Sequence, residues 1–209
     1  MLSRLDPSAR RLVLRLPLAA AGALLLWFLG LASVWGESVV AVSETVIRAV
    51  ERPSATFIEW QSPRVVSFRR SDFGSRSGQP GFDPASITAN LALLLALWGA
   101  TPGATSGRLV RRGLVCLAAL FASHVLHVVL TVEATWATRL GAWSEWYYPR
   151  WEREVFATGR YFFDIVLKYA LPFALWGFFL LIPAFRAREQ AAEEVESAPP
   201  PARKRKKKR

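Results

Sequence analysis

Two histidines, His124 and His127, are the residues whose type and spacing come closest to supporting chemistry. They stand three residues apart within an apolar run, so on a helix they share one face. A metal site would need further ligands, and two haems would need histidines on another helix, but the chain contains only these two. Hydrogen bonds to another helix, for example to Asn90 or Asp164, are the interpretation that we favour. We therefore expect neither a metal nor another cofactor.

The other reactive or charged side chains in the apolar runs form no catalytic set. Cys116, the only cysteine, stands about 16 Å along a helix from His127 at ~1.5 Å per residue, so the two cannot act as nucleophile and base. We expect Cys116 to be a small buried apolar residue. Asp164 and Lys168 stand four residues apart, and we expect them to pair with each other. The candidate polar network within the membrane is Asn90, His124, His127, Asp164 and Lys168.

Four apolar runs must hold these side chains in place. They are residues 16–36, 85–101, 113–132 and 161–185, and each is long enough to cross a hydrocarbon layer about 30 Å thick. The first run lacks a clear cleavage site, so we interpret it as an uncleaved anchor and not as a signal peptide. Pro172 lies inside the fourth run and should kink it or leave a carbonyl free for a neighbouring helix. The expected fold is an all-α membrane protein with four transmembrane helices.

Basic residues lie at alternate ends of these runs and predict how the chain is oriented. Residues 1–15, 102–112 and 186–209 contain 16 Lys or Arg and five acidic residues, whereas 37–84 and 133–160 contain ten basic and ten acidic residues. Cytoplasmic loops carry the excess of Lys and Arg. We therefore expect both termini and the short basic loop in the cytoplasm, and the two longer segments on the outer side. The net charge of +11 then reflects topology, and we expect no nucleic-acid partner.

The first outward segment, 37–84, combines a helical pattern with a strand pattern. Helical spacing that would extend the first helix beyond the membrane is shown by Val39, Val42, Val46 and Val50. The stretch SATFIEWQSPRVVSFRR is rich in β-branched and aromatic residues and predicts a short strand pair around Ser62-Pro63. The following SDFGSRSGQPGFDP predicts a loop. We favour a small cap over the helices, and a docking surface for a partner is the alternative.

The second outward segment, 133–160, is rich in aromatic residues that could contact the membrane or a partner. Its candidate contact residues are Trp136, Trp143, Trp146, Tyr147, Tyr148 and Trp151. A single helical stripe, typical of an amphipathic helix at the lipid headgroups, contains Trp136, Leu140, Trp143 and Tyr147. An exposed aromatic surface could also bind an extended peptide or a lipid chain. Pro149 is well placed as the first residue of a helix that continues into the fourth run.

The end of the chain is strongly basic and follows an acidic, alanine-rich stretch. Basic residues close to a membrane helix attract anionic lipid, at ~1 kcal/mol per charge near the surface. The residues that we expect to contact lipid headgroups are Arg203, Lys204, Arg205, Lys206, Lys207, Lys208 and Arg209.

Three segments resemble a worn form of the core of exosortases, the multi-span transpeptidases of bacterial envelopes. They are DPASITANLALLLAL, SHVLHVVL and GRYFFDIV, at the places where that family carries a catalytic Cys, Arg and His. The first has no cysteine, the second has His127 where the family has Arg, and the third has no histidine. The exosortase activity therefore carries over to no residue of this chain. The size, the four-span layout and the Trp-rich outer segment are similar to those of the exosortase H-associated membrane proteins.

That resemblance covers roughly residues 85–185 and implies a protein of the bacterial inner membrane that assists the sorting of proteins with a C-terminal Trp-Gly-type signal. The resulting hypothesis is a non-enzymatic accessory protein. It would contact a membrane-protein partner, such as an exosortase or its substrate, through its outward segments. The alternative is a membrane enzyme or carrier that uses the intramembrane polar residues His124, His127, Asp164 and Lys168.

Overall fold

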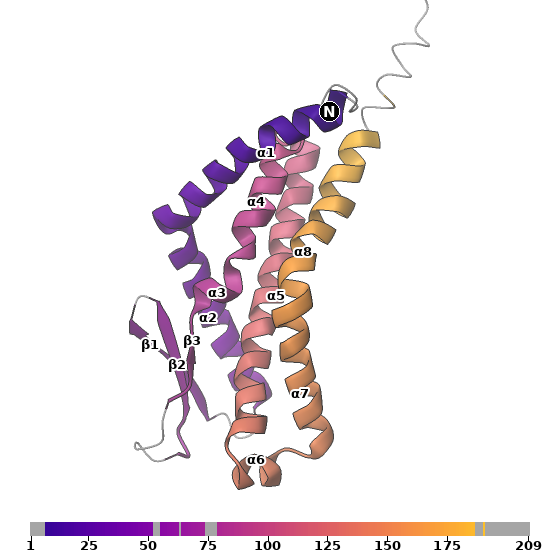
Figure 1. Ribbon diagram of the computed structural model, residues 1–209. Helices are drawn as coiled ribbons and strands as arrows, with labels where there is room; N and C mark the ends of the chain where they lie inside the picture. The colour runs from indigo at the N-terminus through magenta and orange to yellow at the C-terminus, as the bar shows by residue number, and fades with distance from the viewer. Residues whose placement is uncertain (1–6, 52–54, 63, 74–78, 187–189, 191–209) are drawn as a thin grey trace, which may run out of the picture.

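The chain folds mainly into helices, with one small antiparallel sheet (Figure 1). The residues that the computed structural model describes are 7–51, 55–62, 64–73, 79–186 and 190. Three helical stretches are long and apolar enough to cross a membrane, namely Arg10–Val50, Gly107–Arg139 and Arg150–Arg186. A shorter apolar stretch covers Pro84–Ala100. This pattern is that of a membrane protein.

The N-terminal helical stretch is bent sharply at Gly30. Helices α1 (Pro7–Leu26) and α2 (Ala32–Val50) are joined by a wider π-helical turn, Trp27–Leu31, in which Gly30 has a φ of 133°. Residues with a side chain rarely adopt this backbone conformation, so the glycine permits the bend. Beyond it the two halves separate: α1 lies across α4 (Asn90–Ala100), and α2 runs beside α5 (Gly107–Arg139) toward the sheet (Figure 1). The apolar pattern of the first run did not predict this bend.

The short apolar stretch forms α3 (Pro84–Thr88) followed by α4. Asp83 caps α3, because its Oδ1 accepts a hydrogen bond from the backbone N–H of Ala85 at 2.9 Å. Pro84 occupies the first turn, where its missing N–H leaves no hydrogen bond unmade. The helical stretch Pro84–Ala100, in which Asn90 begins α4, therefore has a well-defined start.

Two glycines let neighbouring helices approach closely around α4. A Cβ on Gly99 would lie 3.3 Å from the Cβ of Ala19 on α1, and a Cβ on Gly113 would overlap the ring of Trp98. Helices in lipid have little hydrophobic drive to associate, so close packing at small residues contributes much of their attraction. The positions of α1 and α5 against α4 depend on these contacts.

The second half of the chain forms a long helical hairpin. At ~1.5 Å per residue, α5 is about 50 Å long, well beyond a hydrocarbon layer of about 30 Å. After the short helix α6 (Ala142–Tyr147), the chain returns beside α5 (Figure 1). The returning elements are α7 (Arg150–Phe162), a π-helical turn Phe163–Leu167, α8 (Lys168–Leu175) and a second π-helical turn Trp176–Leu181. Pro149 precedes α7, so the helix start expected there is confirmed to within one residue.

The sheet contains β1 (Thr56–Ser62), β2 (Val65–Arg70) and β3 (Gly81–Phe82), in the order β1-β2-β3 with antiparallel pairs. The strand pair expected around Ser62 is confirmed, and its register shifts between Trp60 and Ser62. The loop prediction is wrong at β3. These two residues pair with Val66 and Ser67, a contact between distant residues that overrides the local Gly and Pro signal.

An apolar core lies between the sheet, the end of α2 and the end of α5. We call this part of the molecule the cap, and its buried core residues are Val40, Ile47, Ile58, Val66, Phe68, Val132 and Trp136. The predicted extension of the first helix is confirmed, since α2 runs to Val50. The buried side of α2 contains Val39, Val40 and Ile47, whereas Val42, Val46 and Val50 are exposed.

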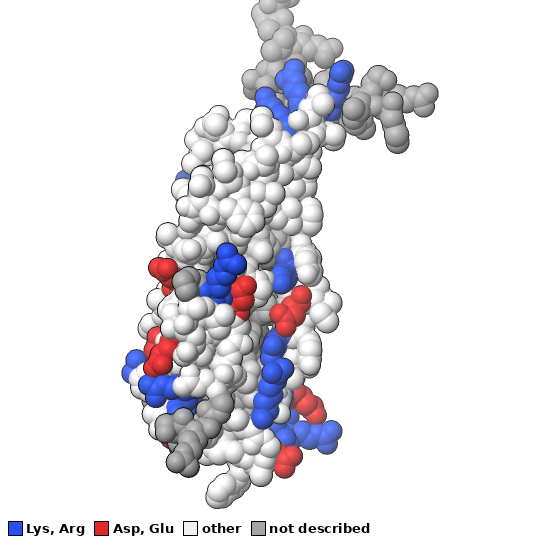
Figure 2. Space-filling view, turned by 60° about the vertical axis from the view of Figure 1, so that its left-hand side comes forward, with Lys and Arg blue, Asp and Glu red and all other residues white. Residues whose placement is uncertain are grey.

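The charged side chains divide the surface into zones (Figure 2). On the face shown, Lys and Arg gather at the end that carries the N-terminus, and next to them lies a broad zone that is free of basic and acidic residues apart from one basic group at its left edge. We call it the uncharged zone. The opposite half, with the cap, shows both signs. Helix α6 lies at the far end of this charged half (Figure 1), away from the uncharged zone. The aromatic stripe expected over Trp136–Tyr147 does not lie on a single helix, because α5 ends at Arg139, α6 begins at Ala142, and Trp136 packs into the cap. The position of this segment at the lipid headgroups stays a prediction.

We predict that Gly30→Ala lowers the free energy of unfolding of the detergent-solubilised protein by roughly 1–3 kcal/mol, because alanine at this φ is strained. Its melting temperature should fall accordingly. Gly22→Ala in α1 is the matched control. A Cβ meets nothing within 4 Å at either position, so only the backbone conformation differs. The control should be neutral or stabilising, since alanine is the better helix former. Equal melting temperatures for the two variants, measured by circular dichroism, would contradict the bend.

Candidate functional site

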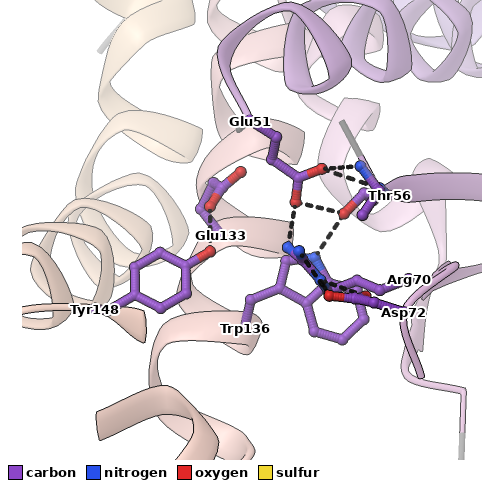
Figure 3. A network of polar contacts seen from close by, with 8 residues as sticks. Glu51, Thr56, Arg70, Asp72, Glu133, Trp136 and Tyr148 are labelled. Carbon is purple, nitrogen blue, oxygen red and sulfur yellow. Dashed lines mark hydrogen bonds and ion pairs between the residues drawn. The ribbon is translucent and has the colours of Figure 1, made fainter. Parts of the chain in front are cut away.

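A buried arginine at the end of β2 organises the cap (Figure 3). The guanidinium of Arg70 donates from Nη1 to Glu51 Oε1 (2.8 Å) and from Nε to Asp72 Oδ1 (3.0 Å). The side chains of Arg70 and Glu51 are only 4% and 5% exposed. Burial alone lowers the pKa of Arg70, but the hydrogen bond to Asp72 and the charges of Glu51 and Asp72 raise it above its ordinary value. Arg70 is therefore a permanently charged group inside the protein.

The carboxylate of Glu51 connects α2 to the sheet and to α5. Its Oε2 accepts the backbone N–H groups of Ala55 (3.2 Å) and Thr56 (2.9 Å), and its Oε1 accepts the hydroxyl of Thr56 (2.6 Å). The same hydroxyl oxygen accepts the indole N–H of Trp136 at 3.1 Å. The end of α2, the sheet and α5 thus meet around one buried ion pair (Figure 3).

Arg70 also holds the aromatic residues of α6 in position. Its guanidinium carbon lies 5.0 Å from the ring centre of Trp143 and 6.0 Å from that of Tyr147. These two rings stack with centres 4.5 Å apart. A cation against an aromatic face contributes roughly 0.5–2 kcal/mol, more where water is excluded. The stack therefore rests on a buried charge.

The turn between α5 and α6 is held by hydrogen bonds of its own. Ser144 donates its hydroxyl to the carbonyl of Trp136 (2.6 Å) and accepts the backbone N–H of Leu140 (3.0 Å). Gly141 has a φ of 58°, the left-handed conformation that a tight reversal requires and glycine readily adopts. The hydroxyl of Ser144 and the turn at Gly141 together set the position of α6 on the end of α5.

Tyr148 anchors the other end of α6. Its hydroxyl donates to Glu133 Oε2 at 3.0 Å (Figure 3). Burial raises the pKa of Tyr148, and the neighbouring Glu133 carboxylate raises it further, so the hydroxyl stays protonated and remains a donor.

Of the six aromatic residues predicted as contact residues, three form the surface of this end. We call them the aromatic tip: Trp146 (90% exposed), Tyr147 (50%) and Trp151 (64%). Trp143 and Tyr148 are partly buried against the cap core and support the tip from beneath. Trp136 is 1% exposed inside the cap, so its prediction as a partner contact is wrong for this surface.

Deeper among the helices, His124 joins three elements. The indole N–H of Trp35 donates to His124 Nδ1 at 3.0 Å, so Nδ1 must be an acceptor and the ring proton sits on Nε2. That Nε2 then donates to Asn90 Oδ1 at 2.6 Å. The amide of Asn90 in turn donates to the carbonyl of Lys168 at 2.9 Å. Position 172 is proline and offers no N–H to this carbonyl, so the free carbonyl expected from Pro172 is confirmed.

His127 forms a separate contact with the last helical stretch. Its Nε2 lies 2.9 Å from Asp164 Oδ1, and the other oxygen of Asp164 lies 3.6 Å from Arg160 Nε. The pair expected between Asp164 and Lys168 is wrong, and Lys168 Nζ lies 5.8 Å from the ring centre of Tyr169. The π-helical turn Phe163–Leu167 is the reason, because its wider spacing removes the alignment of residues four apart.

These bonds give the side chains of Asn90, His124, His127 and Asp164 partners within the protein. Among the described residues, the only buried side-chain nitrogen or oxygen without a hydrogen-bond partner is Arg153 Nε. No group of three His, Cys, Asp or Glu in the described part of the chain could hold a metal. Cys116 is buried, as expected, with its Sγ 3.7 Å from the carbonyl of Leu175. What these groups do in the structure is join helices.

The sequence analysis did not identify the ion pair at the centre of the cap or the tryptophan that bonds to His124. Glu51 and Arg70 are 19 residues apart in a charge-balanced segment, and no local spacing marks them as partners. Trp35 likewise carries no signal that would pair it with His124. Arg160 could have been found, since it lies four residues before Asp164 on a helix. The basic residues 203–209, predicted to contact lipid, lie outside the described residues.

Comparison with protein-family models, curated proteins and solved structures finds no match to this chain.

We predict that Arg70→Met destabilises the protein by roughly 3–5 kcal/mol, because it leaves the Glu51 carboxylate buried without its cation. The matched control is Arg69→Met on the same strand. Arg69 pairs with Glu59 at 2.8 Å but is 47% exposed, and ion pairs in contact with water contribute little to stability. Denaturant unfolding followed by tryptophan fluorescence measures both free energies. Equal losses would show that the buried pair has no special role.

A double-mutant cycle tests the bond between Asn90 and the Lys168 carbonyl. Asn90→Ala should cost roughly 1–2 kcal/mol in the wild-type background, since it leaves a buried carbonyl unpaired. In a Pro172→Ala background the helix supplies its own N–H to that carbonyl. Asn90→Ala should then cost about 0.5–1 kcal/mol less. Additive effects in the cycle would mean that the carbonyl does not depend on Asn90.

Proposed function

We propose that this chain is a non-enzymatic accessory protein of the bacterial inner membrane that contacts a membrane-protein partner through its aromatic tip. The observation that carries the proposal is the contrast within α6 and the start of α7. Trp146, Tyr147 and Trp151 are exposed, while the ions and rings beneath them are buried. Exposed aromatic side chains on a rigid base are the residues that dominate the energy of protein interfaces. An apolar patch with ordered support is also typical of a contact site.

The proposal includes four crossings of the membrane, with the cap on the outer side and both termini in the cytoplasm. The fourth crossing is Pro84–Ala100, which is about 25 Å long at ~1.5 Å per residue and so just sufficient. Support comes from the uncharged zone and from the basic residues gathered at one end of it (Figure 2). Cytoplasmic segments carry such an excess of Lys and Arg.

The partner in this proposal is an exosortase-type enzyme or its substrate. Support for this class of partner comes from the resemblance of residues 85–185 to exosortase spans that lack the reactive groups. The corresponding segments of this chain contain Asn90, His127 and Asp164, whose side chains bond to other helices. A chain that keeps such a layout without its chemistry fits a role beside the enzyme.

The experiment is a pull-down from membranes of the native host in mild detergent, with the tagged full-length chain as bait. We predict recovery of an envelope-sorting protein, and a loss of at least tenfold in its recovery when Trp146 and Trp151 are both replaced by alanine. Two central aromatic contacts at about 2 kcal/mol or more each would give this loss.

The matched control for this pull-down is Tyr161→Ala. Tyr161 lies on the same helix as Trp151 and is equally exposed, at 65% against 64%, but it is outside the tip. It should retain the partner. Recovery of no envelope-sorting protein by the wild-type chain would overturn the proposal.

A further inference from the structure

Two adjoining grooves lie at the end of the molecule opposite the cap. They are formed between the start of α5 and the end of the last helical stretch, and both are lined by Arg108, Arg112 and Pro183. One has a volume of about 610 Å³ and also contains Arg186. The other, of about 520 Å³, also contains Arg111. Because they share two arginines, a single elongated molecule could occupy both.

The polar lining of these grooves has one sign of charge. Four arginines line them, and no acidic residue does. Within the described part of the chain, none of the ion pairs involves any of the four. The planar guanidinium group binds phosphate oxygens in pairs, with better geometry than lysine. The charge therefore favours a phosphate-bearing ligand.

The apolar lining narrows the ligand further. Val115, Phe178 and Phe179 line the same groove as Arg111 and Arg112, and all three side chains are exposed. Val115 follows Arg111 by four residues on α5, so the charged and apolar parts of the wall are one helical turn apart. A free phosphate would leave the apolar part unused, whereas a phospholipid has a headgroup for the arginines and an acyl chain for the phenylalanines.

We infer that these grooves form a binding site for an anionic phospholipid. The phosphate lies between Arg108 and Arg112, and an acyl chain follows Val115, Phe178 and Phe179 toward the uncharged zone. Basic pockets between membrane helices on the cytoplasmic side are suited to anionic headgroups. The site requires only that the chain is embedded in a membrane, and it is independent of the proposed partner at the aromatic tip.

The test uses the full-length chain in nanodiscs of phosphatidylcholine that contain a small fraction of phosphatidylglycerol with a photoactivatable acyl chain. Crosslinks are mapped by mass spectrometry of peptides. We expect crosslinks at residues 113–117 and 176–183, and a loss of at least tenfold in Arg108→Gln/Arg112→Gln. The control is Arg10→Gln/Arg11→Gln, which removes the same charge from α1 without altering the grooves, and it should crosslink like the wild type. Thermal melting confirms that each variant is folded.

Three results would overturn the site. Equal losses in the two double variants would show a diffuse electrostatic effect, and equal crosslinking by a photoactivatable phosphatidylcholine would show no selection for the anionic headgroup. The third result is competition by inorganic phosphate. If phosphate displaces the lipid when it is added at the same concentration as the lipid, the site binds a simple anion. Phe178→Ser/Phe179→Ser should weaken crosslinking by the lipid. An unchanged yield would show that the acyl chain does not bind at these two residues.

Discussion

The buried ion pair between Arg70 and Glu51 is the interaction on which the cap depends. Removing two charges from water costs several kcal/mol for each, and the attraction between them returns this only when further hydrogen bonds satisfy both groups. Both groups have such bonds here. The guanidinium of Arg70 also donates to Asp72, and the carboxylate of Glu51 also accepts two backbone N–H groups that follow α2. Such a pair adds little net stability, but it admits only one arrangement of the elements that supply it. The sheet, α2 and α6 are oriented by that requirement.

The same arrangement explains why the aromatic tip is exposed. The ring of Trp143 lies against Arg70 and stacks on Tyr147, and Tyr148 is bonded to Glu133. With these contacts made, α6 cannot rotate to bury its remaining rings. Trp146 therefore faces away from the protein for a structural reason, and its exposure supports the proposed contact with a partner.

Among the helices the constraint is different, because lipid offers no hydrophobic reason for them to associate. Their contacts rest on small residues, as at Gly99, and on a few polar bonds. The bond from Asn90 to the Lys168 carbonyl exists because Pro172 removes the usual partner of that carbonyl. His124 adds the connection to Trp35 on the first helical stretch. Pro172 thus leaves a carbonyl to which another helix can bind.

Much of the fold could be predicted from the sequence wherever the signal was local. The strand pair around Ser62 and the free carbonyl before Pro172 follow from residue types and spacing alone. The bend at Gly30 could not be predicted, because a single glycine in an apolar run is also compatible with a straight helix. Arg70 was missed because SFRR contains two adjacent arginines, and only the fold decides which of them is buried. Trp136 was misplaced because its aromatic stripe fits both a lipid interface and a protein core, and the packing of the end of α5 against the sheet decides between them.

We propose that the aromatic tip faces a protein on the outer side of the membrane. The most direct measurement replaces Trp146 by the photoreactive amino acid benzoylphenylalanine and irradiates living cells of the native host. We expect a discrete protein adduct at this position, and none from the same amino acid at position 161. Adducts with lipid alone at position 146 would contradict it, because they would place the tip in the membrane.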